Sequence, residues 1–199
     1  MANALRRLDV SNATLDQKRE ILKYATDVRK FEIERFWQRS LFFWGFIGVA
    51  FVGYTQLLNR GNLALVVACF GLVCSMAWTL QNRGSKYWQE AWEFKVQAVE
   101  FDVLGADLFA NREPLKQKGV WGARRFSVSK LAITLSDFTV LIWLVLAFNA
   151  IQLTMAAAMG KFAVIATVVT ILYVALLFTC RQSKADADPR HKAKAHSRN

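Results

Sequence analysis

The chain has 199 residues, of which 54% are hydrophobic and 21% are charged, and its formal net charge at pH 7 is +11. So many hydrophobic residues are unusual for a soluble protein, whereas the charged share indicates well-solvated segments outside an apolar environment. The three cysteines form no C-x-x-C pair, which argues against a disulfide framework or a zinc site.

The N-terminal 40 residues predict one long helix. Thr14 and Gln17 have the spacing of a capping box, in which each side chain bonds a backbone N–H of the other residue. No Pro or Gly follows before residue 41, and apolar residues recur at steps of three and four. We therefore expect this helix to continue directly into the apolar segment that follows it.

Four apolar segments predict four membrane spans. Residues 41–58 and 63–80 are separated by only four polar residues, and residues 131–153 and 162–180 form a second close pair. Each segment is about long enough for a helix that rises 1.5 Å per residue to cross a hydrocarbon core of roughly 30 Å. The predicted fold class is all-α: a polytopic membrane protein with four transmembrane helices in two antiparallel hairpins.

Small residues recur along the second apolar segment and predict a helix-packing seam, because lipid gives helices little hydrophobic reason to associate. The seam residues are Ala64, Ala68, Gly71 and Ser75. Gly45 and Gly48 in the first segment are its expected counterpart.

The residues after the second span predict a helical stalk in the cytoplasm. After a possible break at Gly84, residues 86–104 have two apolar faces. The first face consists of Tyr87, Ala91, Phe94, Ala98 and Phe101, and the second of Trp88, Trp92, Val96, Val99 and Val103. One face suffices for packing on the N-terminal helix, so the other predicts contact with a neighbouring subunit. The expected interface residues are Tyr87, Trp88, Trp92, Glu93 and Val96; the alternative is a monomeric helical cap on the membrane surface.

Asp137 is the one acidic residue within a predicted span, and Thr134 and Lys130 lie on the same face of its helix. A carboxylate in hydrocarbon costs several kcal/mol unless it is paired, protonated or wetted. One interpretation is an ion path or a proton-sensitive gate. The other, which we favour, is an ion pair with Lys130 or with an Arg of a neighbouring helix.

The basic residues predict the orientation of the chain. Residues 1–40 and 81–130 carry nine Lys and Arg each and the tail after residue 180 carries six, whereas the two short turns contain only Arg60 and Lys161. Cytoplasmic loops hold this excess, so both termini are expected in the cytoplasm. The charge also predicts attraction to anionic lipids rather than to nucleic acid.

These patterns divide the chain into five segments. They are a cytoplasmic N-terminal helix (1–40), a first transmembrane hairpin (41–80), a cytoplasmic helical loop (81–130), a second transmembrane hairpin (131–180) and a disordered basic tail (181–199). Residues 105–130 look irregular, and the 199-residue chain leaves no room for a large separate soluble domain.

No catalytic, cofactor or metal motif is recognisable. Both histidines, His191 and His196, lie in the tail, and no nucleotide-binding, zinc-protease or hydrolase motif occurs. The sequence therefore predicts a protein that is not an enzyme and that needs no cofactor.

Two stretches resemble the RipA-like family of octameric bacterial inner-membrane proteins. Residues 82–93 read Asn-Arg-Gly-Ser-Lys-Tyr-Trp-Gln-Glu-Ala-Trp-Glu, and residues 126–130 read Phe-Ser-Val-Ser-Lys before a span that contains Ser136 and Trp143. The resemblance covers roughly residues 35–180, although this chain has Ala91 where the family has Asn. It implies a homo-oligomer, by name an octamer, in the bacterial cytoplasmic membrane, and it implies no settled biochemical activity.

The leading functional hypothesis is therefore a non-enzymatic oligomeric scaffold or envelope-homeostasis factor. A channel along the symmetry axis is the main alternative, for which Asp137, Asn149 and Gln152 would line the path. A sensor or effector of an antiviral system is a further alternative.

Overall fold

The structure is a computed structural model, which describes residues 13–106, 127–156 and 160–180. These residues form four helices and no strand: α1 (Leu15–Gln56), α2 (Gly61–Leu104), α3 (Val128–Ala156) and α4 (Gly160–Thr179). The predicted disordered tail and most of the irregular connection before the third span lie outside the described residues.

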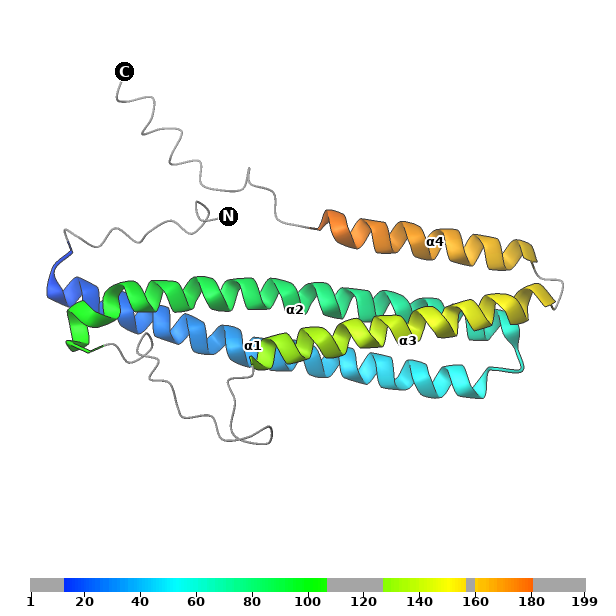
Figure 1. The fold of residues 1–199 in the computed structure, drawn as a ribbon, viewed down its shortest axis with the longest axis horizontal. Helices are drawn as coiled ribbons and strands as arrows, with labels where there is room; N and C mark the ends of the chain where they lie inside the picture. The colour runs from blue at the N-terminus through cyan, green and yellow to red at the C-terminus, as the bar shows by residue number, and fades with distance from the viewer. Residues whose placement is uncertain (1–12, 107–126, 157–159, 181–199) are drawn as a thin grey trace, which may run out of the picture.

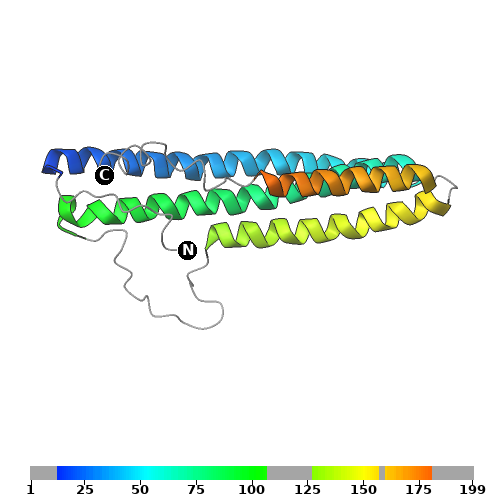
Figure 2. The same ribbon diagram turned by 90° about the horizontal axis from the view of Figure 1, so that it is seen from above.

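The helices form two antiparallel hairpins that lie side by side (Figures 1 and 2). The α1–α2 turn and the end of α3 lie at the same end of the molecule (Figure 1). Helix α2 is central, because it packs on α1 and also on α3 and α4. Its 44 residues give a length of about 66 Å, roughly twice the thickness of a hydrocarbon core. The α1–α2 hairpin therefore extends well beyond α3 and α4, and we call this extension the stalk.

The predicted start and continuity of α1 are confirmed. The Thr14 hydroxyl accepts a bond from the Gln17 backbone N–H at 3.3 Å, and the Thr14 N–H donates to Gln17 Oε1 at 2.9 Å. From there α1 runs without interruption for 42 residues, from the polar N-terminal segment into the apolar one.

The predicted break at Gly84 is wrong, because α2 continues through this residue. A helical glycine costs only about 1 kcal/mol relative to alanine, and packing of the stalk outweighs that cost. Val96 and Val99, beyond Gly84, have no exposed surface. The helix ends instead at Leu104 and is capped by Gly105, whose φ of 66° is the left-handed conformation that glycine adopts without strain.

Three helices of the described chain, α2, α3 and α4, are long and apolar enough to cross a membrane. Helix α1 does not meet this criterion. It ends at Gln56, two residues before the predicted end of the first span, and its apolar part contains Gly, Tyr, Thr and Gln. A span in α1 stays a prediction.

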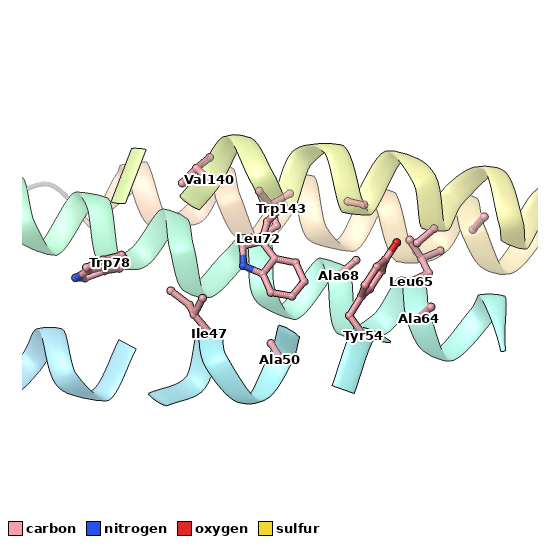
Figure 3. Close-up of a cluster of buried hydrophobic side chains, with 13 residues drawn as sticks. Ile47, Ala50, Tyr54, Ala64, Leu65, Ala68, Leu72, Trp78, Val140 and Trp143 are labelled. Carbon is pink, nitrogen blue, oxygen red and sulfur yellow. The ribbon is translucent and has the colours of Figure 1, made fainter. Parts of the chain in front are cut away.

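Trp143 of α3 is the centre of the apolar core (Figure 3). Its ring has no exposed surface and lies 4.6 Å from the Phe51 ring and 6.2 Å from the Tyr54 ring, between centroids. On the α2 side it contacts Gly71, where a side chain would overlap the indole. One tryptophan thus joins α1, α2 and α3.

Candidate functional site

A polar cluster joins α2 to α3 near the level at which the apolar part of α2 ends. The Arg83 guanidinium donates to both carboxylate oxygens of Asp137, at 3.1 and 2.9 Å. The Thr79 hydroxyl also donates to Asp137 and accepts a bond from Arg83 at 2.9 Å. Asp137 is therefore held by a two-point ion pair and a hydroxyl from the neighbouring helix, the geometry in which Arg binds carboxylates most strongly.

A second set of hydrogen bonds lies on the buried side of this cluster. The Ser136 and Thr79 hydroxyl oxygens lie 3.1 Å apart. The Asn82 amide donates to Ser136 Oγ at 3.2 Å and to the Ala132 carbonyl at 3.4 Å. Asn82 and Ser136 have no exposed surface, so the cluster fixes the register of α2 against α3.

Lys130 and Thr134, predicted beside Asp137, are not in this cluster. The Thr134 hydroxyl donates to the Lys130 carbonyl at 3.0 Å, which satisfies it within α3. Lys130 is exposed, and no ion pair joins it to Asp137 within the described residues. The other predicted partner of Asp137, an Arg of a neighbouring helix, is observed as Arg83 of α2. Sequence reasoning did not identify which arginine this is, and it missed Thr79 and Asn82, which lie on the same helix as Arg83. Their spacing of three and four residues at the end of an apolar run was the available signal.

The Arg83–Asp137 pair lines one end of a groove between α2, α3 and α4, with a cavity of about 340 Å³. The other lining residues are Met76, Thr79, Leu80, Val140, Leu141 and Phe178. Apart from Thr79 these are apolar. Among the described residues no group of His, Cys, Asp and Glu side chains could bind a metal ion.

The predicted small-residue seam lies inside the helix bundle. Ala64, Ala68 and Ser75 have no exposed surface, and Gly71 meets Trp143. The expected counterpart was wrong, because a side chain at Gly45 or Gly48 would meet no atom within 4 Å. The seam residue Gly71 therefore faces a large aromatic residue of α3 rather than glycines of α1.

The predicted interface residues of the stalk separate into two groups. Within one chain, Glu93 pairs with Arg29 of α1 at 3.0 Å, and Trp92 lies against Tyr24 of α1, with ring centroids 6.2 Å apart. Val96 has no exposed surface within the single chain. Glu93 and Trp92 therefore join α2 to α1 within one chain, and a role of these residues between subunits stays a prediction.

Tyr87 and Trp88 form the other group, because both stay exposed in the single chain, at 48% and 41%. Phe94 and Phe101, from the same predicted face as Tyr87, are also exposed. The predicted division into two faces holds only in part, because Ala91 of the first face is buried and Trp88 of the second face is exposed.

Tyr54 ties α1 to α3 within the apolar core. Its hydroxyl donates to the Leu146 carbonyl at 3.1 Å and accepts a bond from the Asn149 amide at 3.0 Å. We expect Tyr54→Phe to lower the free energy of unfolding by about 1 kcal/mol, because both partners lose a bond in an apolar environment. Equilibrium unfolding in mixed micelles measures this change. Tyr173→Phe, an exposed tyrosine of α4, is the control and should leave stability unchanged.

The long apolar helices and the extended stalk together define a helical membrane protein. Sequence comparison gives the family: the model of the octameric membrane protein family (8xMP) matches residues 19–152, from the stalk part of α1 almost to the end of α3. The chain belongs to this family. Neither a curated protein nor a solved structure matches the chain.

Proposed function

We propose that this protein is a non-enzymatic scaffold or envelope-homeostasis factor of the bacterial inner membrane, of the RipA-like type, assembled as an octamer through its stalk. The family name supports self-association. The single observation that supports assembly through the stalk is an exposed aromatic stripe on α2, formed by Tyr87, Phe94 and Phe101. These residues are seven apart and are 48%, 40% and 61% exposed.

The stripe has the pattern of a helix-packing surface. A seven-residue repeat keeps side chains on one side of a helix over several turns, as in coiled coils. One small residue, Ala98, lies between Phe94 and Phe101 and is exposed. Small residues between large ones let a second helix approach closely. The partner that this surface fits is the stalk of a second copy.

The proposal includes a fourth span in α1 and both termini in the cytoplasm. Helix α1 is antiparallel to the apolar part of α2 and contributes Phe51 and Tyr54 to the same core as Trp143. Helix α2 is long and apolar enough to cross the membrane, so the paired segment of α1 is most simply placed beside it. The basic excess of the stalk and tail supports the cytoplasmic side for both.

We favour a scaffold over a channel because two of the three polar residues considered for a conducting path are bonded inside the subunit. Asp137 is held by Arg83 and Thr79, and Asn149 donates to Tyr54. A side chain used in this way is less available to replace the hydration shell of a passing ion.

The test of assembly is a double substitution in the stripe, Tyr87→Gln with Phe94→Gln. We expect the octamer to dissociate into smaller species while membrane insertion is unchanged, because both substitutions lie outside the core. Mass photometry in mild detergent measures the size. Phe31→Gln, an exposed aromatic residue of the α1 part of the stalk, is the matched control. An octamer that survives the double substitution, or is lost equally in the control, contradicts the assignment.

A further inference from the structure

The groove between α2, α3 and α4 changes from polar to apolar along its length. Its polar end is formed by Thr79, Arg83 and Asp137, and its apolar lining includes Met76 and Leu141. Arg83 lies three residues after the end of the apolar segment 63–80, which places it near the boundary of the hydrocarbon core. Met76 is seven residues earlier on the same helix, which places it about 10 Å deeper. A phospholipid that lies with its headgroup at Arg83 has its polar and apolar parts in the same order as the groove.

The ion pair retains unused hydrogen-bonding capacity on its open side. A guanidinium has five N–H donors, and the bonds to Thr79 and Asp137 use three of them. Two donors of Arg83 are therefore without a partner among the described residues. The carboxylate of Asp137 accepts three bonds of about four that it can accept. Both side chains are exposed to a large extent, 49% for Arg83 and 42% for Asp137.

We propose that the groove binds a phospholipid with a phosphoethanolamine headgroup from the cytoplasmic leaflet. The phosphate accepts the two remaining N–H bonds of Arg83, and the ammonium donates to Asp137, so that both bonds are charge-assisted. An acyl chain lies along Met76, Leu141 and Phe178. The inference rests on the proposed orientation, which assigns the Arg83 end of the groove to the cytoplasmic side.

Charge complementarity decides between headgroups. Arg83 and Asp137 carry opposite charges and sum to zero, so the site has no surplus positive charge to favour an anionic lipid. A phosphoglycerol headgroup satisfies Arg83 equally well but offers Asp137 only a neutral hydroxyl. The site therefore differs from the basic segments of the chain, whose attraction to anionic lipid is non-specific.

The experiment is native mass spectrometry of the full-length octamer. The protein is equilibrated in nanodiscs that contain equal amounts of phosphatidylethanolamine and phosphatidylglycerol with identical acyl chains, and is then released into mild detergent. We expect one retained phosphatidylethanolamine for each subunit. In the double variant Arg83→Gln, Asp137→Asn, retention should fall about tenfold, the size expected when charge-assisted bonds become neutral ones.

A second variant keeps the test valid if the double variant is unstable. Leu141→Trp fills the apolar part of the groove and leaves both charges in place, so it should also release the lipid. Arg60→Gln, an exposed arginine in the turn between α1 and α2, is the control and should retain it.

Three results would overturn the proposal: equal retention in all variants, preferential retention of phosphatidylglycerol, or efficient crosslinking of Leu141→Cys to a neighbouring subunit. The last result would show that a second copy covers the groove. The same spectra give the mass of the oligomer, so loss of the lipid site is distinguishable from failure of the proposed assembly.

Discussion

Replacing Arg83 by Leu is expected to lower the free energy of unfolding by about 2 kcal/mol, because it leaves the Asp137 carboxylate unpaired at the edge of the hydrocarbon core. A second substitution, Asp137→Leu, should recover most of this loss, since a pair of apolar residues replaces an ion pair at little cost. The double variant is thus expected to be more stable than the single variant. Equilibrium unfolding in mixed micelles measures both.

The free energies of unfolding of the wild type, Arg83→Leu and the double variant, compared with one another, distinguish an ion pair from two side chains that act independently. Independent contributions would add, and the double variant would then be the least stable. Arg35→Leu provides the control, because Arg35 is exposed on α1 and, among the described residues, interacts only with neighbours on its own helix: it donates to Gln38 at 2.9 Å and lies over the Phe31 ring. A loss of stability in this control similar to that of Arg83→Leu would contradict a special role for the pair.

The second large effect is expected at Gly71. Its substitution by Ala should destabilise the bundle by about 1–3 kcal/mol, the usual range for overpacking a tight core. A Cβ atom at this position would lie well under 3.0 Å from ring atoms of Trp143. The indole has little freedom to move away, because Phe51 and Tyr54 lie against it. The shift in unfolding midpoint in detergent measures the effect.

Gly48→Ala is the matched control for this substitution. A side chain at Gly48 would meet no atom within 4 Å, and alanine is the better helix former, so stability should be unchanged or slightly higher. Combining Gly71→Ala with Trp143→Leu should recover part of the loss, because it removes the overlapping ring. If Gly48→Ala destabilises as much as Gly71→Ala, the close approach of α2 to Trp143 is not the cause.

The apolar segments and the capping box were sufficient to predict the helices, because both signals are local. Thr14 and Gln17 lie within one turn, and the spacing of apolar residues requires no knowledge of other helices. The predicted break at Gly84 failed for the opposite reason. A local breaker was outweighed by packing of α2 on α1, which the sequence does not display.

The partners of Asp137 and the roles of the stalk residues depend on how two helices are rotated against each other. Arg83 is 54 residues from Asp137, and the sequence offered Lys130 on the same helix as an equally good candidate. In the stalk, Val96 and Tyr87 belong to faces of similar apolar character. Only the position of α1 shows that Val96 is buried and Tyr87 is free.

The absence of a break at Gly84 has a mechanical consequence. Since α2 is one continuous rod, a change in its inclination within the bilayer is also a change in the direction of the stalk. About 20 residues extend beyond Arg83, which is a lever arm of roughly 30 Å. A change in tilt of about 10°, well within the range that transmembrane helices adopt in bilayers of different thickness, moves its tip by roughly 5 Å. Bilayer thickness and the spacing of the stalk tips are therefore geometrically coupled.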